Sequence, residues 1–454
     1  MPKATLILPS LNVGGYIEEC LESVRCQSLE DIEILCIDAG STDGTYEILR
    51  EHAARDSRIR LIRSRVRSYG YQVNLGLSIA RGEYVGIVET DDSIEPDMYE
   101  TLCRVAGEEG LDYAKGGFYT MAAPCEGERY LLEHPLPDTG RLLSYTYYTD
   151  RPLSPDVYIW NGVYRREFLQ KHQIRLNESP GAAFQDCGLR YLTDMNLERG
   201  MFIDRLLYRY RRDNAASSTY DTRFARFNLE ECRYIRRQMQ EQGLTDRARR
   251  AFMARESVMM ALSPYMTYRE HSRPDEAVRR DMEGLRQIIC RDREEGLLTR
   301  REMHPDFYLE MRLFTENPQA YEAYAGIRAE INSSVYRDFV REMRGKDQIV
   351  LCCAGKAAKF ALCLLRMNGL ENIAAVCDNN KALWGGTYQG REVVSPKEAV
   401  RRYPKAHYLV ANRACPGEIM KQLAGYGIRE EAMSAYTLPL QAFGSTNLFM
   451  RDMD

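Results

Sequence analysis

Long hydrophobic runs are missing from the 454-residue chain, which has no stretch of about eighteen consecutive apolar residues. We therefore expect no transmembrane helix. The first three residues lead directly into the strand-like segment 5–8, which is too short and too soon followed by polar residues to be a signal peptide. The sequence thus predicts a cytoplasmic protein, and it leaves open a peripheral position at the inner face of the membrane.

Paired metal-binding motifs and an excess of one charge are also missing. The thirteen cysteines form no C-x-x-C pair and the six histidines are dispersed. We therefore expect reduced, buried thiols rather than disulfides or a zinc site. Arginine and lysine total 62 against 66 acidic residues, a net charge of −4. This balance argues against nucleic acid as a partner.

The composition is that of a soluble globular protein, 44% hydrophobic and 28% charged, and the length suggests two to three domains. Residues 4–116 alternate between short apolar runs and amphipathic stretches. Strands are predicted at 5–8, 32–37, 59–62 and 84–88, and helices at 15–26 and 42–52. This repeated pattern predicts an α/β fold with a mixed, mainly parallel sheet and helices on both faces.

Acidic residues follow the run 84–88, where Glu89, Asp91 and Asp92 end a strand that is predicted to be buried on both faces. The loops after the first two strands, 9–12 and 38–44, are expected at the same edge of the sheet, where open α/β sheets bind ligands. Gathered carboxylates favour a divalent cation that holds a diphosphate. An acidic first turn of the next helix is the alternative that the residues alone leave open.

Several short motifs, taken in order, carry a resemblance to a known family. They are P-S-L-N at 9–12, S-V-R-C-Q at 23–27, D-A-G-S-T-D-G-T at 38–45, N-L-G-L at 74–77 and E-T-D-D at 89–92. Residues 4–116 resemble the nucleotide-sugar domain of the family 2 inverting glycosyltransferases, which have the GT-A fold. The resemblance implies an enzyme that moves a sugar from a nucleotide-diphosphate-sugar, with a UDP-sugar favoured, to an acceptor hydroxyl.

The same resemblance assigns roles to residues of these motifs. Asp92 would be the direct ligand of Mn²⁺ or Mg²⁺, Asp91 would face the sugar or the ribose, and Asp38 would line the nucleoside pocket. Donor contacts are also implied for Pro9, Ser10, Asn12, Tyr71 and Asn74.

Some positions depart from the family pattern. Ala39 stands where the family often has a second acid that contacts the base, so the identity of the nucleotide is not determined. Glu89 is either a further ligand or a strand-end acid, and we favour the second. Tyr71 either stacks on the donor or packs in the core.

The acceptor side is implied by two later segments. W-N-G-V-Y-R at 160–165 resembles a family segment under the acceptor site, where Trp160 would offer a face to a sugar ring, although a buried tryptophan is the commoner case. Inverting transfer needs a base for the acceptor hydroxyl. The resemblance assigns that role to Asp186, with Gln185 where the family often has Glu. Arg211 and Arg212, after a predicted strand at 205–210, would approach the diphosphate or close a loop over it.

The predicted domains are a GT-A domain over 1–220, a helical region over 221–345, a small Rossmann-like α/β domain over 346–440 and a tail over 441–454. The Arg-rich side of the helical region suits solvent or an anionic membrane surface, with solvent favoured. In the C-terminal domain only Gly355 remains of the three fingerprint glycines, and Cys353 stands at the tight turn. A docking or vestigial domain is therefore favoured there over nucleotide binding.

The expected pathway is assembly of a bacterial surface polysaccharide, with a glycan or a lipid-linked acceptor, and homo-oligomers are left open. A sugar-nucleotide-forming nucleotidyltransferase would need a glycine-rich basic phosphate loop after the first strand, which residues 9–12 lack. A non-catalytic sensor or scaffold that binds a nucleotide-sugar without turnover is the alternative from another functional class.

Overall fold

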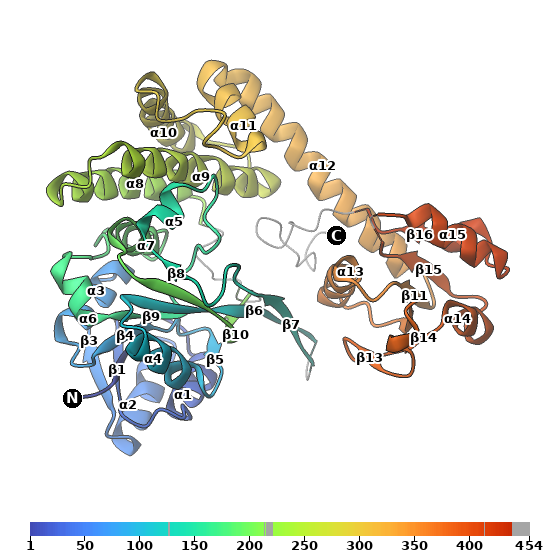
Figure 1. Cartoon of the computed structure of the whole chain (residues 1–454), viewed down its shortest axis with the longest axis horizontal. Coiled ribbons are helices and arrows are strands. Elements are labelled where there is room, and N and C mark those ends of the chain that lie inside the picture. The colour runs from blue at the N-terminus through green and yellow to red at the C-terminus, as the bar shows by residue number, and fades with distance from the viewer. Residues whose placement is uncertain (126–127, 213, 215–220, 413, 438–454) are drawn as a thin grey trace. The chain divides into compact units, whose positions relative to one another are not determined.

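The computed structural model describes residues 1–125, 128–212, 214, 221–412 and 414–437. The chain divides into two compact units, which are Met1–Met121 with Glu133–Tyr324, and Ala122–Leu132 with Ala325–Asp454. The first unit contains a large sheet and a group of helices, and the second contains a smaller sheet (Figure 1). The predicted tail over 441–454 lies outside the described residues.

The large sheet has ten strands, with the order β3-β2-β1-β4-β9-β6-β10-β5 and with β7 beside β6 and β8 beside β10. The parallel pairs include β1 with β2, β1 with β4, β2 with β3, and β6 with β10. Strand β9 is antiparallel to both of its neighbours, β4 and β6. The bounds are β1 Ala4–Ser10, β2 Ile32–Asp38, β3 Ile59–Arg63, β4 Tyr84–Ile87, β5 Ser93–Ile94, β6 Tyr113–Cys125, β7 Glu128–His134, β8 Leu142–Leu143, β9 Gly162–Arg165 and β10 Gly200–Arg211. The predicted mixed, mainly parallel sheet is confirmed.

Helices cover both faces of this sheet because its central strands are apolar on both sides. In α1 (Ile17–Arg25) the buried residues Ile17, Cys20, Leu21 and Val24 form one helical face that packs on one side of the strands. Residues of alternate register, including Ile7 and Leu35, pack on the other side with the α3 region. The remaining helices of this part are α2 Thr45–Arg55, α3 Tyr69–Ile79, α4 Met98–Glu108, α5 Tyr145–Thr149, α6 Arg166–Lys171 and α7 Asp186–Asn196.

The predicted helical region is helical in the structure. Its helices are α8 Phe224–Glu241, α9 Arg247–His271, α10 Glu276–Glu294, α11 Pro305–Glu316 and α12 Pro318–Arg344. The helices α8 to α11 fall in the same compact unit as the large sheet. Among the described helices, none combines the length and hydrophobicity needed to cross a membrane.

The second unit contains a smaller, mainly parallel sheet with the order β13-β14-β12-β11-β15-β16. Its strands are β11 Ile349–Cys352, β12 Ile373–Cys377, β13 Thr387–Tyr388, β14 Arg391–Val394, β15 His407–Val410 and β16 Met433–Ala435. The helices α13 Lys356–Met367, α14 Pro396–Arg402 and α15 Pro416–Gly425 connect them. The Rossmann-like assignment of this unit stays a prediction.

Candidate functional site

The carboxyl ends of β1, β2 and β4 lie at one edge of the large sheet, as the strand pattern predicts. Ser10 and Asp38, the last residues of β1 and β2, are paired in register. The Thr90 hydroxyl donates a hydrogen bond to the Pro9 carbonyl at 2.9 Å, which ties the acidic loop after β4 to the loop after β1. The acids at 89–92 and the loops at 9–12 and 38–44 therefore form one edge.

Asp92, the predicted metal ligand, lies below the surface of this edge. It is 1% exposed. Its Oδ2 accepts a hydrogen bond from the Tyr208 hydroxyl at 2.8 Å, and its Oδ1 accepts one from the Arg211 backbone N–H at 2.6 Å. Burial, with the nearby Asp91 carboxylate, raises the pKa of Asp92 well above its usual range. Both oxygens of Asp92 thus bind β10 in this structure, and its role as the direct metal ligand stays a prediction.

Asp91 is the partly exposed carboxylate of the pair. Its Oδ2 accepts a hydrogen bond from the Asn214 side-chain amide at 2.8 Å. The Arg211 guanidinium donates to the Asp91 carbonyl and to Glu19, both at 2.7 Å. Arg211, which was expected to approach a diphosphate, therefore braces the acidic loop against α1.

Glu89 carries a second partly exposed carboxyl group at this edge. The Tyr69 hydroxyl donates to its Oε1 at 2.5 Å. Burial raises the pKa of Glu89 to about 8, the Tyr69 hydrogen bond opposes this rise, and the Asp91 and Asp186 carboxylates add to it. Tyr69 is a site residue that sequence reasoning missed, because its partner Glu89 lies 20 residues further along the chain.

The predicted nucleoside side of the edge is built from backbone contacts. The Asp38 carboxylate is 1% exposed and accepts hydrogen bonds from the Gly40 and Ser41 backbone N–H groups at 2.9 and 3.2 Å. Asn12 has a positive φ of 54°, and its Oδ1 accepts a hydrogen bond from the Thr42 backbone N–H at 2.9 Å. Ser10 is 1% exposed. Asp38 and Asn12 therefore shape the loops at this edge.

Asn74, expected as a donor contact, is turned instead toward the segment that leads to Asp186. Its Nδ2 donates to the Leu176 carbonyl and to Glu178 Oε1, both at 2.9 Å. Its Oδ1 accepts a hydrogen bond from the Leu176 backbone N–H at 3.0 Å. Tyr71 is half-buried in the first turn of α3, where its backbone N–H is capped by the Ser68 hydroxyl. Asn74 thus binds the segment 176–178 in this structure, and the donor-contact roles of Asn74 and Tyr71 stay predictions.

Asp186 is the first residue of α7 and is half-buried. Burial raises its pKa, and the Arg190 guanidinium opposes the rise. The loop before it is held at Gly181, whose carbonyl accepts a hydrogen bond from the Tyr69 backbone N–H at 2.8 Å. The negative charge of Asp186 also raises the pKa values of Tyr69 and Glu89. The fold therefore brings Asp186 within electrostatic reach of the acidic loop.

The helical region contributes a residue under α7 that sequence reasoning did not find. Glu231 of α8 is 1% exposed and accepts a hydrogen bond from the Asn177 side chain at 3.0 Å. Gly188, in the first turn of α7, lies so close that a Cβ there would be 2.6 Å from Glu231 Oε1. Nothing in the local sequence of α8 indicates this contact, because it joins segments that are far apart in the chain.

Trp160 lies in an aromatic cluster and is 5% exposed. Its ring is stacked on Tyr208 at 4.1 Å and on Tyr158 at 4.4 Å between ring centroids. Of the two cases that the sequence left open for Trp160, the structure has the buried one, and a contact with a sugar ring stays a prediction. The indole is packed between neighbouring rings, as is common for a large apolar side chain.

With this geometry established, the chain can be compared with known proteins. The sequence profile described as Glycosyl transferase family 2 matches residues 5–172. The similarity to this family thus covers residues 5–172, which we call the glycosyltransferase domain. The chain is 31% identical over 216 residues to "Uncharacterized glycosyltransferase EpsJ" of Bacillus subtilis (strain 168), covering 46% of this chain and 61% of EpsJ.

Two further proteins extend the comparison. A chondroitin synthase of Escherichia coli is 38% identical over 103 residues, which is 23% of this chain and 15% of that protein. The crystal structure of S. aureus TarS 1–349 has a TM-score of 0.53 at 17% identity, over 74% of this chain and 92% of that chain, and TarS was also crystallised with UDP-GlcNAc. The likeness to TarS establishes the GT-A-like fold. The chain spans only part of the curated relatives, 61% of EpsJ and 50% of a putative glycosyltransferase, EpsH, also of Bacillus subtilis.

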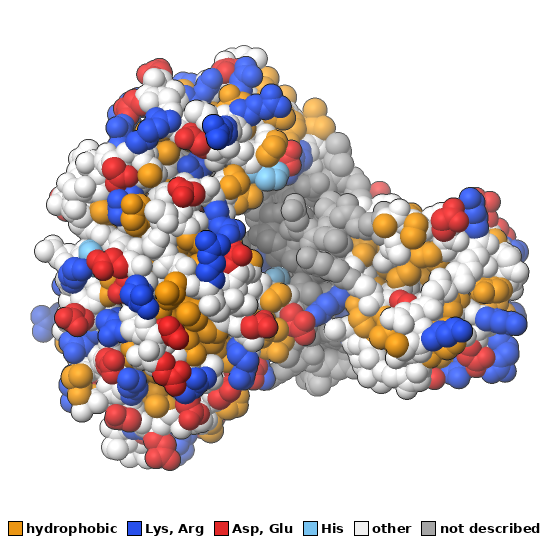
Figure 2. All heavy atoms as spheres, in the orientation of Figure 1, with side chains coloured by type: hydrophobic (Ala, Val, Ile, Leu, Met, Phe, Trp, Pro, Cys, Tyr) orange, Lys and Arg blue, Asp and Glu red, His pale blue; other side chains and the backbone are white. Residues whose placement is uncertain are grey.

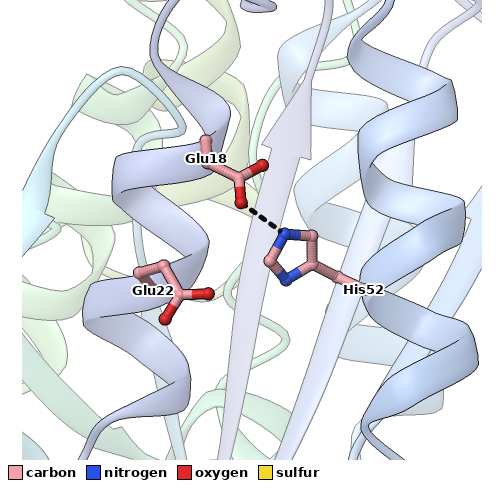
Figure 3. A group of neighbouring side chains, drawn as sticks. All are labelled: Glu18, Glu22 and His52. Atoms are coloured by element: carbon pink, nitrogen blue, oxygen red, sulfur yellow. Dashed lines mark hydrogen bonds and ion pairs between the residues drawn. The ribbon is translucent and has the colours of Figure 1, made fainter.

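One other group of side chains in the glycosyltransferase domain has the composition of a metal site. Glu18 and Glu22 of α1 and His52 of α2 point toward one another, with potential ligand atoms within 4.8 Å (Figure 3). His52 Nδ1 lies 3.3 Å from the Arg25 guanidinium, a group that only donates, so Nδ1 accepts and Nε2–H donates to Glu18 at 3.0 Å. Because both ring nitrogens are engaged and Arg25 also pairs with Glu22 at 2.7 Å, we interpret the group as a link between α1 and α2.

The charged side chains on the visible face do not form a basic surface of the kind that binds a polyanion. Basic and acidic side chains are interspersed over the glycosyltransferase domain (Figure 2). This distribution agrees with the net charge of −4.

Proposed function

We propose that the first unit transfers a sugar from a nucleotide-diphosphate-sugar to an acceptor hydroxyl, with inversion at the anomeric carbon. One observation carries the proposal. The acidic loop at 89–92 and the loop before Asp186 come from distant parts of the chain, yet both bind Tyr69, whose hydroxyl donates to Glu89 and whose backbone N–H donates to the Gly181 carbonyl. A donor bound at this loop would have its anomeric carbon next to the Asp186 carboxylate, which can take the proton of the acceptor hydroxyl.

A divalent cation, Mn²⁺ or Mg²⁺, fits the residues at this edge. Asp91 presents a partly exposed carboxylate beside Glu89, and such hard oxygen ligands, one or two per site, suit a cation that also binds a diphosphate. Asp92 would hold the loop in place through its hydrogen bonds to β10. When bound, the cation supplies charge stabilisation to the departing nucleoside diphosphate.

Asp186 would take the proton from the acceptor hydroxyl as that oxygen attacks. Its raised pKa brings it closer to the operating pH, where a general base is most effective. The start of α7 orients the carboxylate, and the Arg190 guanidinium opposes the rise of its pKa. The loops that contain Asp38 and Asn12 would shape the pocket for the nucleoside.

The biological setting is proposed at a coarser level. The chondroitin synthase supports a role in polysaccharide assembly, and TarS supports a UDP-sugar as the first donor to test. A glycan or lipid-linked acceptor belongs to the same proposal. We place the protein in the cytoplasm, with contact to the inner face of the membrane and self-association as further parts of the same proposal.

A donor panel tests the proposal. We would measure nucleotide-sugar binding and hydrolysis by the full chain with Mn²⁺ or Mg²⁺, for the wild type and for Asp91→Ala and Asp186→Asn. We expect Asp91→Ala to lose activity whether or not metal is added. We expect Asp186→Asn to keep donor binding while the rate of transfer falls at least about a hundredfold. The exposed Asp204 on β10 provides the control, Asp204→Asn.

The outcomes separate the rival interpretations. Binding of no nucleotide-sugar by the wild type would refute the donor site. Donor binding without turnover when glycan acceptors are supplied, unchanged by Asp186→Asn, would instead support the non-catalytic sensor or scaffold.

A further inference from the structure

The segment that leads to Asp186 has no regular secondary structure of its own to fix it. Residues 172–185 lie between α6 and α7 and belong to neither a helix nor a strand. Phe184, two residues before Asp186, has a φ of 63°, a left-handed conformation that is strained for a bulky side chain. Such a backbone persists only where its surroundings hold it. The position of Asp186 therefore depends on contacts from other elements.

One face of α8 supplies such contacts. Helix α8 lies beside α7 (Figure 1), and its residues Glu231 and Tyr234 are one turn apart, so they lie on the same face. The Tyr234 hydroxyl donates a hydrogen bond to the Arg175 carbonyl at 2.9 Å. Glu231 Oε2 accepts one from the Asn177 side-chain amide at 3.0 Å. This face of α8 thus holds the irregular segment at two points before Asp186.

The same two side chains reach the start of α7. A Cβ on Gly188 would lie 2.6 Å from Glu231 Oε1 and 3.2 Å from the Tyr234 ring, so a glycine is needed for α8 to approach this closely. Gly188 follows Asp186 by two residues, in the first turn of α7. Glu231 and Tyr234 therefore hold the chain on both sides of Asp186.

Helix α8 is itself anchored to the rest of the helical region by its opposite face. Leu229 packs against α10, where a Cβ on Gly284 would lie 2.7 Å from its Cδ2 atom. The Arg236 guanidinium binds the Asp292 carboxylate of α10 and the Ser257 hydroxyl of α9. These contacts make α8 a firm support for whatever packs on its other side.

We propose that Glu231 and Tyr234 are positioning residues for Asp186, so that the helical region takes part in orienting the base. This inference rests on the proposed function of Asp186 and adds to it the side chains that fix its place. Contacts before and after a carboxylate limit how far it can move, and a displacement of about 1 Å at a reacting group lowers the rate by as much as a hundredfold.

Single variants of the full chain test these roles. We would measure the donor Kd, the thermal unfolding temperature and kcat for transfer, with the nucleotide-sugar and acceptor that the wild type turns over best. For Glu231→Ala and Tyr234→Ala we expect kcat to fall roughly ten- to a hundredfold while the donor Kd stays near the wild-type value. Glu231→Gln keeps an oxygen that can accept the Asn177 hydrogen bond and should restore most of the rate.

A milder variant covers the case in which an alanine variant does not fold. Tyr234→Phe keeps the ring beside Gly188 and removes only the hydroxyl that binds the Arg175 carbonyl. We expect its unfolding temperature to stay near that of the wild type and its kcat to fall roughly threefold.

The matched control is Leu229→Ala, on the opposite face of the same helix. It removes packing between α8 and α10 and leaves the contacts of Glu231 and Tyr234 in place. The cavity should lower the unfolding temperature at least as much as Glu231→Ala does, whereas kcat should be unchanged. Loss of kcat in Leu229→Ala, in proportion to its loss of stability, would reduce the effect to general destabilisation and overturn the inference.

A double-mutant cycle with Asp186→Asn shows whether Glu231 acts through the base. Once the base is removed there is no group left to position, so Glu231→Ala should lower kcat no further in the Asp186→Asn background. An equal loss of kcat in both backgrounds would show that Glu231 acts independently of Asp186 and would overturn the proposed role.

Two other results separate this inference from the proposed function. Wild-type kcat in Glu231→Ala, Tyr234→Ala and Tyr234→Phe, with a low kcat in Asp186→Asn, would overturn the positioning role and leave the base intact. Wild-type kcat in Asp186→Asn itself would show that the proposed base is wrong, and the inference would fall with it.

Discussion

Replacing Asn74 with alanine would separate two roles for this side chain, a contact with the donor and a clamp on the segment that leads to Asp186. Asn74 is 3% exposed, and its amide makes three hydrogen bonds with Leu176 and Glu178. Two of these satisfy the backbone N–H and C=O groups of Leu176. The structure therefore predicts that Asn74→Ala acts on stability and on the base rather than on the donor.

The magnitude follows from the hydrogen bonds. Each contributes about 1 kcal/mol net, and a buried backbone group left without a partner costs about 1–3 kcal/mol. We expect Asn74→Ala to lower the free energy of unfolding by about 2–4 kcal/mol. A displacement of Asp186 by about 1 Å would lower kcat for transfer by as much as a hundredfold, while the donor Kd stays near the wild-type value.

Urea unfolding, donor binding by calorimetry and kcat for transfer would be measured on the same preparations. Ser78→Ala is the matched control, because Ser78 is an exposed residue of the same helix whose hydroxyl bonds only to the Leu75 carbonyl. A tenfold weaker donor affinity with unchanged stability would refute the clamp and restore the donor role that the sequence motif implies.

Three further predictions concern stability. Lys115→Met removes the cation that lies 2.7 Å from the buried Asp156 carboxylate, and we expect urea unfolding to show a loss of about 3–5 kcal/mol. Gly188→Ala places a Cβ 2.6 Å from Glu231 Oε1, and we expect thermal unfolding to show a loss of about 1–3 kcal/mol. Burial, with Lys346 nearby, lowers the pKa of His407 in the folded state to about 4, below its ordinary value of 6.5. Neutral His407 therefore makes its full contribution to the free energy of unfolding of the second unit above pH 6.5. That contribution, at most about 3 kcal/mol, is lost as the pH falls toward 4.

Each of these predictions has a control and a contradicting result. Replacing Asp156 together with Lys115 by apolar residues should recover much of the lost stability, and no recovery would contradict the charge argument. Gly425→Ala adds a Cβ with no atom within 4 Å and should be neutral or slightly stabilising. His407→Gln should flatten the pH dependence between pH 6.5 and 4, and an unchanged slope would assign it to other groups.

The sequence determined the parts of this protein that depend on local pattern. Alternating apolar runs and amphipathic stretches predicted the parallel core, because strand and helix periodicities are properties of neighbouring residues. The face formed by Ile17, Cys20, Leu21 and Val24 is buried as expected. Since parallel strands end at one edge, the meeting of the loops after β1, β2 and β4 also followed from the sequence.

The exposure of individual side chains was decided only by the tertiary structure. Asp91 and Asp92 are adjacent acids in the sequence, and only the pairing of the loop with β10 buries one of them. The burial of Trp160 likewise depends on Tyr208, which follows it by nearly fifty residues. Local pattern contains no information on such partners.

The same limit applies to the contacts around the base. Asp186 was predicted from its motif, whereas the supports of its segment are Asn74 on α3 and Glu231 on α8. Asn74 lies 102 residues before Leu176 in the chain, and Glu231 lies 54 residues after Asn177. The sequence determined which elements form and at which edge of the sheet they converge. The packing between distant elements decided which carboxylates are exposed and which residues hold them, because burial and hydrogen bonding depend on contacts across the fold.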